Sequence, residues 1–173
     1  MQNTLKHTLD MLSRTPDVLH QLLDGLPESW THANEGPDTW SPFDVLGHLL
    51  HGERTDWMER TQIILSAQEV RKFRPFDRFA QFEESKGKDL QQLLAEFDIL
   101  RKQNVAHIRS LNLTNEQLER TGIHPAFGEV KLSQLLTTWM VHDLNHLAQI
   151  ARVLGKQYKA ATGPWVEYLR ILQ

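Results

Sequence analysis

Apolar residues recur at intervals of three and four along most of the chain, which is the spacing of one face of an α-helix. The pattern predicts four long helical regions, at about residues 3–26, 41–66, 88–111 and 131–154. The first region should be interrupted near Thr15, because a residue that precedes a proline, here Pro16, is disfavoured in a helix. Little of the chain shows the two-residue alternation that is typical of β-strands.

The second region opens with several helix-start signals. Ser41 is a good N-cap, Pro42 suits the first helical position, and Asp44 favours the positive end of the helix dipole. Trp40 and Val45 occupy the two positions of a hydrophobic staple. We therefore expect a helix to begin at Pro42, and Asp44 to serve its start rather than to bind a ligand.

The segments between these regions differ in character. Residues 70–88 are too irregular for a long helix and predict a crossover that is docked by evenly spaced rings, at Phe73, Phe76, Phe79 and Phe82. Residues 113–130 predict a short helix, capped by Thr114 with Gln117 at the box position, and then a turn. Residues 164–172 predict a short C-terminal helix. The expected fold is all-α: a four-helix bundle with a long crossover connection and short additional helices.

The composition is that of an ordinary globular protein, with 173 residues, of which 40% are hydrophobic and 24% charged. This length suits one compact unit, so residues 1–173 are expected to form a single domain. Lys and Arg number 19 against 22 Asp and Glu, without a block of like charge, which disfavours nucleic acid and membranes as partners. The N-terminal residues lack a signal-peptide core, so the expected location is cytoplasmic.

Cysteine is absent from the chain. This excludes disulfides, thiolate metal ligands and a cysteine nucleophile supplied by the protein. Any thiol chemistry would need a thiol that arrives on a cosubstrate.

The segment VHDLNHLAQI, residues 141–150, places His142 and His146 four positions apart in a helix that is otherwise apolar on one face. On a helical wheel both histidines border that face, and Asp143 falls in its middle, where a carboxylate needs a partner. Two imidazoles one turn apart can bind the same ion. The pattern also fits two histidines at the edge of the core that hydrogen-bond to other helices, and a third ligand would decide for the metal.

The second predicted helix carries another group of titratable residues. His48 lies at the edge of its apolar stripe, whereas His51 turns toward solvent on the same wheel and is expected at the surface. Glu53 lies close to the apolar line and should be buried, with an imidazole N–H as a candidate partner. We expect Glu53 and Asp143 to be structural groups, or to fix the orientation of ligand rings from a second shell around the metal.

Two motifs together resemble the DinB-like (DinB/YfiT) superfamily of metal-dependent enzymes. The first, W-S-P-x-D-V-L-G-H-L-x-x-x-E, spans residues 40–53, and the second, H-D-L-x-H-x-A-Q-I, spans residues 142–150. The resemblance extends over nearly the whole chain and implies a four-helix bundle with a long crossover, often as a homodimer. It also implies a divalent metal ion held by one histidine of the second helix and two of the fourth, which correspond here to His48, His142 and His146.

Three neutral imidazoles leave coordination positions for water or substrate, as in catalytic metal sites. Relatives in the superfamily include transferases of low-molecular-weight thiols and a thiol-dependent isomerase. The sequence therefore predicts a divalent-metal-dependent enzyme of the hydrolase or thiol-transferase type that acts on a small molecule. The ion is expected to be zinc, nickel, manganese or iron, and no side chain is assigned as catalytic acid, base or nucleophile.

Two alternatives stay open at this point. The chain could be a bundle that binds a metal or another ligand without turning it over, or a structural dimer whose histidine site is empty. An open metal coordination favours the enzyme, whereas a closed one favours storage or structure.

Overall fold

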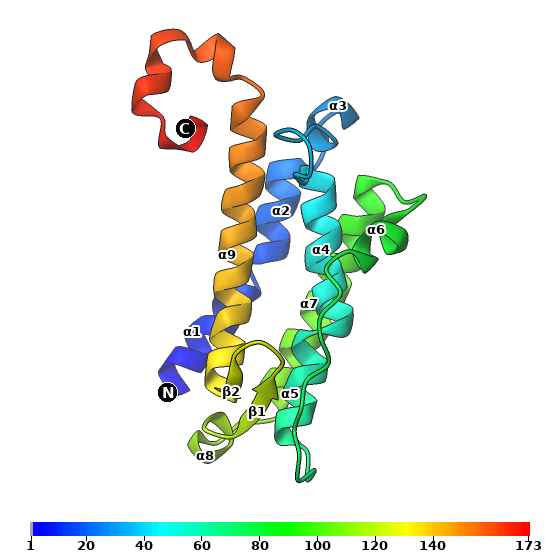
Figure 1. Cartoon of the computed structure of the whole chain (residues 1–173), viewed down its shortest axis with the longest axis vertical. Coiled ribbons are helices and arrows are strands. Elements are labelled where there is room, and N and C mark those ends of the chain that lie inside the picture. The colour runs from blue at the N-terminus through cyan, green and yellow to red at the C-terminus, as the bar shows by residue number, and fades with distance from the viewer. Residues whose placement is uncertain (1) are drawn as a thin grey trace.

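The fold is a bundle of long helices, as the apolar periodicity predicts (Figure 1). The computed structural model describes residues 2–173, with side chains from Thr4 onward. Its main helices are α1 (Gln2–Leu12), α2 (Thr15–Leu23), α4 (Pro42–Thr55), α5 (Trp57–Leu65), α7 (Leu90–Ser110) and α9 (Leu132–Lys156). Short helices α3 (Glu28–Thr31), α6 (Ala80–Ser85) and α8 (Asn115–Leu118) lie in the connections. Within residues 2–173, no helix has the length and apolar character needed to cross a membrane.

The predicted start of the second helix is confirmed. Ser41 is the N-cap of α4, its side chain accepts a hydrogen bond from the Asp44 backbone N–H at 3.2 Å, and the Asp44 carboxylate accepts one from the Ser41 N–H at 2.9 Å. This reciprocal capping box satisfies two N–H groups that a helix end otherwise leaves unpaired. The region does not continue unbroken to Ser66, because the backbone departs from helical geometry at Asp56 and separates α4 from α5.

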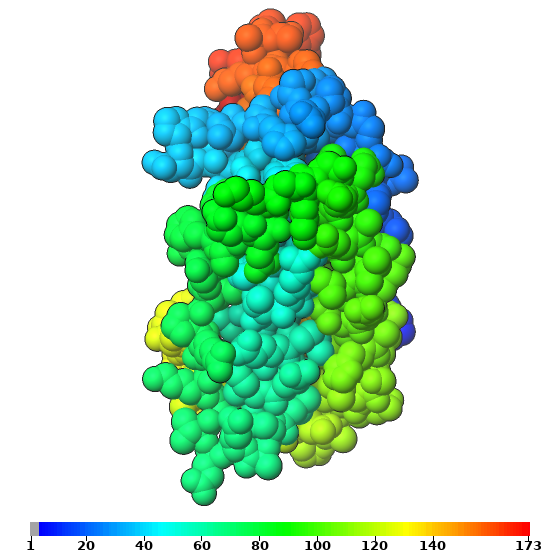
Figure 2. Space-filling model, turned by 90° about the vertical axis from the view of Figure 1, so that its right-hand side faces the viewer, coloured from blue at the N-terminus to red at the C-terminus, as the bar shows by residue number. Residues whose placement is uncertain are grey.

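The crossover after α5 runs along α4 and ends in α6 (Figure 2). Of its predicted docking rings, Phe73 is 2% exposed and Phe76 is half-buried, whereas Phe79 and Phe82 are 62% and 40% exposed, so the prediction holds for the first two rings only. The helix α6 approaches α4 closely at Gly47, where an added Cβ would lie 2.5 Å from the Ser85 hydroxyl. Glycine at this position therefore lets the crossover cover the stretch of α4 that carries His48.

One local prediction was incomplete and another was wrong. Residues 113–130 hold not only the short helix α8 but also a hairpin of β1 (Thr121–His124) and β2 (Gly128–Lys131), because their backbone groups pair although the strands lack apolar alternation. The C-terminal segment forms 3₁₀ turns, η1 (Lys159–Tyr168) and η2 (Arg170–Leu172), rather than an α-helix. The backbone is extended at Leu169, between η1 and η2, which breaks the helical path within residues 164–172, and Gly163, with a positive φ of 55°, breaks it before Pro164.

A buried ionic cluster joins five of the main helices, α1, α2, α4, α7 and α9. Arg101 on α7 is 1% exposed, and its guanidinium binds both oxygens of Asp143 on α9 and donates to Glu53 on α4 at 2.8 Å. It also donates to the Leu12 carbonyl of α1 at 3.0 Å, and the Thr15 hydroxyl of α2 donates to Asp143 at 2.7 Å. Each of these helices thus contributes at least one group to a single hydrogen-bonded network.

Glu53 and Asp143 are buried, as the wheels predict, at 2% and 1% exposure. The expected partner of Glu53 was wrong, however: its carboxylate accepts from the guanidinium of Arg101, from the Asn104 amide at 3.0 Å and from the Trp139 indole at 2.9 Å. Burial raises the pKa of Glu53, and the positive charge of Arg101 acts against that rise. Arginine is needed here because it stays charged when buried and can bind two carboxylates at once.

Replacement of Arg101 by alanine should lower the free energy of unfolding by about 3–5 kcal/mol, because it leaves two carboxylates buried without their counter-charge. The neighbouring Lys102→Ala is a matched control, since Lys102 pairs with Asp98 while 70% exposed, and an exposed ion pair contributes little to stability. Urea unfolding followed by circular dichroism measures both. Equal losses in the two variants would contradict a central role for the Arg101 cluster.

Candidate metal centre

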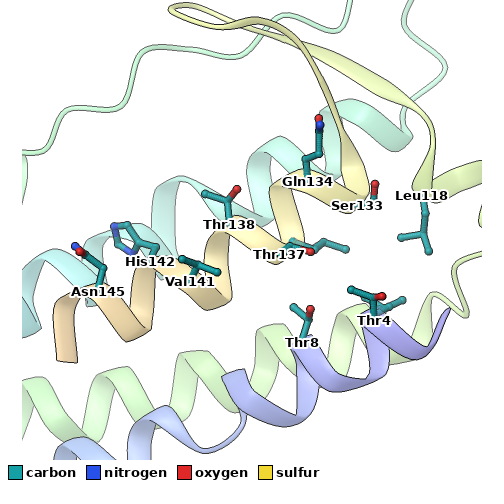
Figure 3. Close-up of a pocket in the computed structure, with 12 residues that line it drawn as sticks. Thr4, Thr8, Leu118, Ser133, Gln134, Thr137, Thr138, Val141, His142 and Asn145 are labelled. Carbon is teal, nitrogen blue, oxygen red and sulfur yellow. The ribbon is translucent and has the colours of Figure 1, made fainter. Parts of the chain in front are cut away.

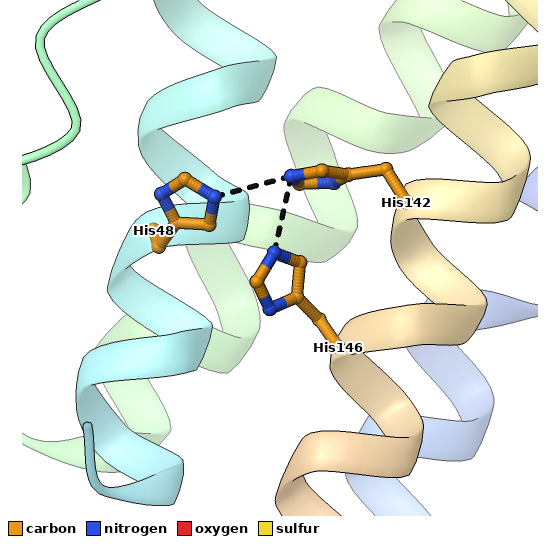
Figure 4. Close-up of side chains that lie close together, drawn as sticks. All are labelled: His48, His142 and His146. Atoms are coloured by element: carbon orange, nitrogen blue, oxygen red, sulfur yellow. Dashed lines mark hydrogen bonds between the residues drawn. The ribbon is translucent and has the colours of Figure 1, made fainter. Parts of the chain in front are cut away.

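The helices α4 and α9 lie side by side and bring three histidines together (Figure 4). The Nε2 atom of His142 lies 3.1 Å from the Nε2 atom of His48 on α4 and 3.1 Å from that of His146 on its own helix. One ligand atom from each ring fits within a span of 4.8 Å. Sequence spacing explains the pair on α9, and the packing of α4 supplies the third ring.

The three rings are largely removed from water by aromatic neighbours. His48 and His146 are 6% and 8% exposed, and His142 is half-buried. The ring centroid of Trp40 lies 4.9 Å from that of His48, and the ring of Phe76 from the crossover lies at 5.7 Å. These walls close the centre on the α4 side and leave His142 as its most accessible member.

Desolvation keeps the three rings neutral. Burial lowers the pKa of His48 to about 3, with the neighbouring His146 as the next cause, and it lowers the pKa of His142 to about 3 in the same way. Burial also lowers the pKa of His146, while the hydrogen bond to Gln149 acts in the opposite direction. Neutral imidazole is the form that offers a lone pair to a metal ion.

Hydrogen bonds alone do not satisfy this arrangement. A neutral imidazole nitrogen has one position in the ring plane, where it holds either a proton or a lone pair, yet Nε2 of His142 faces two other Nε2 atoms. A single cation can accept all three lone pairs. Metal–nitrogen bonds of about 2.0–2.1 Å in a tetrahedral arrangement separate the ligand atoms by roughly 3.3 Å, close to the two observed distances of 3.1 Å.

Gln149 orients one of the rings, and the sequence analysis did not single it out. Its Oε1 atom lies 2.8 Å from Nδ1 of His146, so the Nδ1–H group donates to the amide and the Nε2 lone pair faces the other two histidines. Nδ1 of His48 and Nδ1 of His142 are buried without a hydrogen-bond partner among the described residues. The i, i+3 spacing of His146 and Gln149 within the second motif was the available signal.

The remaining titratable candidates are placed away from the three Nε2 atoms. His51 is not at the surface as expected: it is 5% exposed, because α6 covers it, and its Nδ1 atom donates to Glu84 at 2.8 Å. Asp44 caps α4, as predicted. The hydrogen bonds of Glu53 and Asp143 within the described part of the chain go to the Arg101 cluster, so their contacts are those of structural groups.

The cluster nevertheless reaches the histidines through aromatic packing. Trp139, which donates to Glu53, stacks on Trp57 with a centroid distance of 5.8 Å. Trp57 in turn meets the ring of His142 edge-on at 5.2 Å. The position of His142 therefore depends on packing that the buried carboxylates hold in place.

Comparison with known proteins agrees with this architecture. Residues 11–150 match the DinB superfamily, whereas no curated protein matches the chain. Among solved structures, YfiT from Bacillus subtilis superposes with a TM-score of 0.78 at 21% sequence identity, over 91% of this chain and 89% of that one. YfiT is described as a probable metal-dependent hydrolase with an unusual four-helix bundle topology. The family match spans most of the chain and confirms the resemblance of the two motifs: the chain belongs to the DinB superfamily.

Proposed function

We propose that this chain is an enzyme that uses a divalent metal ion, held by His48, His142 and His146, to act on a small molecule. The observation that carries the proposal is the convergence of three neutral Nε2 atoms on one point, with two separations of 3.1 Å. Catalytic zinc sites use three protein ligands and keep a further position open, whereas structural sites fill all four. Among the described residues, no fourth histidine or carboxylate joins the three.

Each residue of the site has a separate role in binding the ion or in shielding it from water. When bound, a divalent cation would polarise a substrate oxygen and lower the pKa of a water molecule or of a thiol. His48 and His146 supply buried ligands, Gln149 fixes the tautomer of His146, and Trp40 excludes water from the α4 side. The half-buried His142 leaves access for a substrate.

Two reaction types fit these residues. One is hydrolysis, and the other is transfer of a low-molecular-weight thiol, which must come from a cosubstrate because the chain contains no cysteine. Turnover of a chromogenic ester or amide without added thiol identifies the hydrolase. Product formation that requires a low-molecular-weight thiol identifies the transferase. Zinc, nickel, manganese and iron are the ions to compare, since imidazole binds several of them.

A second copy of the chain is the protein partner that we propose, in line with the family resemblance. The arm formed by η1 and η2 loops out beyond the end of α9 and returns against it, where Leu172 packs beside Gly155 (Figure 1). It exposes Trp165 and Tyr168 at 68% and 86%, and Ile171 beside them at 41%. Aromatic side chains of this kind are enriched at protein interfaces.

The metal should be lost from each of the variants His48→Ala, His142→Ala and His146→Ala. Tag-free wild-type protein should contain close to one equivalent of metal by elemental analysis, and the folded variants should contain little, because each loses one of three ligands. Circular dichroism checks folding. His51→Gln is the matched control: His51 is a buried histidine on the same helix that faces Glu84, so its variant should keep the metal.

A folded wild type that stays metal-free after addition of zinc, nickel, manganese or iron would contradict the proposal. Metal that remains in His48→Ala would also contradict it, since one shared site spans α4 and α9.

Gln149→Leu should weaken metal binding by about 10- to 100-fold, because it removes the acceptor that orients His146 through Nδ1. Gln149→Glu keeps an acceptor at that position and should retain or strengthen binding. Competition with a chromogenic chelator measures both affinities. If the two variants bind equally well, Gln149 does not position the ring.

The metal-free protein should lose stability as the pH falls. The pKa of His48 and of His142 is about 3 in the folded protein, against 6.5 for an ordinary histidine. Between these values the unfolded chain binds more protons, so the stability contributed by the neutral rings is complete above pH 6.5 and is lost toward pH 3. The loss reaches at most about 1.4 kcal/mol per pH unit for each histidine.

Urea unfolding with a chelator present, at several pH values below neutrality, measures this loss. The double variant His48→Gln, His142→Gln is the control, because it retains every other titrating group and should show the shallower dependence. Parallel curves for the two proteins would mean that these rings are not held neutral by burial.

A further inference from the structure

A cavity of about 740 Å³ lies between α1 and the outer face of α9. Figure 3 shows Thr4 and Thr8 on one wall, Thr137 and Val141 on the other, and Leu118 at one end. We call it the α1–α9 groove. Its volume falls within the range of roughly 300–1,000 Å³ that is typical of small-molecule sites.

The lining of the groove is uncharged. Among the twelve described residues that line it there is no Asp, Glu, Lys or Arg. Its polar groups are hydroxyls and amides, such as those of Thr138 and Asn145, set among leucine and valine side chains. A charged ligand would give up its hydration here without meeting a counter-charge, which is costly, whereas a neutral ligand would not.

One polar side chain of α1 faces the groove. Thr8 is only 2% exposed, and its hydroxyl points across the groove toward α9 (Figure 3). The Thr8 hydroxyl is not one of the fully buried polar atoms that lack a partner, and Thr8 lines the groove, so its hydroxyl is accessible from there. A hydroxyl can donate and accept hydrogen bonds, so Thr8 can pair with a polar atom of a ligand in the groove.

The groove reaches one of the three histidines of the candidate metal centre. His142 is one of its lining residues and is also the ring whose Nε2 atom faces those of His48 and His146. Asn145 and Thr138 lie beside His142 along the same side of α9 (Figure 3). A molecule that lies in the groove would therefore contact the ring of His142.

We propose that the α1–α9 groove binds the uncharged, mainly apolar part of the substrate, so that the substrate class is a neutral ester or amide with an apolar chain. This inference rests on the proposed function for the role of the histidines, but the groove itself does not depend on a bound metal. Val141 supplies apolar contact to the apolar part of the substrate, and the Thr8 hydroxyl hydrogen-bonds to a polar atom of the substrate.

The test uses three eight-carbon probes of equal length: octanamide, octanoate and octylammonium. Each competes with the neutral fluorophore N-phenyl-1-naphthylamine for the full-length protein, and fluorescence gives the dissociation constants. Octanamide should bind about tenfold or more tightly than either ion, because the groove offers no counter-charge. Thr8→Val, which keeps the side-chain shape, should weaken octanamide several-fold and leave the fluorophore unaffected.

Val141→Arg should weaken octanamide by about tenfold or more, because it fills the groove with a charged side chain. Ile99→Arg is the matched control: Ile99 on α7 is 54% exposed, close to the 52% of Val141, and it does not line the groove. His48→Ala separates the two hypotheses. It should abolish metal binding and leave octanamide binding intact, because His48 does not line the groove.

Equal affinities for the three probes, or equal effects of Val141→Arg and Ile99→Arg, would overturn the neutral-substrate assignment even if the metal is present. So would a wild-type dimer that excludes the fluorophore and becomes a monomer in Val141→Arg by light scattering, because a second copy would then fill the groove. Selective octanamide binding in a protein that takes up no metal would uphold the groove and overturn only the proposed metal chemistry.

Discussion

The buried guanidinium of Arg101 is the constraint on which the bundle and the candidate site both depend. It joins Glu53, five residues after His48 on α4, to Asp143, the residue directly after His142 on α9. A helix advances about 5.4 Å per turn, so a slip of one turn between α4 and α9 would separate His48 from the pair on α9. Two carboxylates that must reach one guanidinium prevent that slip. The same cluster that satisfies its own charges therefore sets the register of the histidines.

The site is shielded from water on the side of His48 and accessible from outside on the side of His142. Trp40 and Phe76 cover His48 and remove the energetic advantage of protonating it, which leaves its lone pair available to a cation. His142 is the exception, since it is half-buried and borders the α1–α9 groove. An ion held here would meet ligands from within the protein and substrate from one direction. This asymmetry is what distinguishes a reactive site from a buried structural one.

Membership of the DinB superfamily and the fold shared with YfiT describe the scaffold, on which different activities can be built. The function must therefore be argued from the groups that this chain places around His142. Those groups are neutral: imidazoles, hydroxyls and amides, with the nearby charges of Glu53, Arg101 and Asp143 paired among themselves in the core. Such surroundings favour a substrate without charge, and a bound cation would be the main source of electrostatic stabilisation.

The sequence alone determined the features that depend on a single helix. These are the cap at Ser41, the spacing of His142 and His146, and the burial of Glu53 and Asp143. The family resemblance, rather than spacing, named His48 as the third member of the histidine set. Tertiary structure decided every contact between elements, including Arg101 as the partner of Glu53, α6 as the cover of His51 and the hairpin pairing of β1 with β2. The physical reason is that helical periodicity fixes which face of a helix is apolar, whereas the neighbour that covers this face depends on how the helices pack.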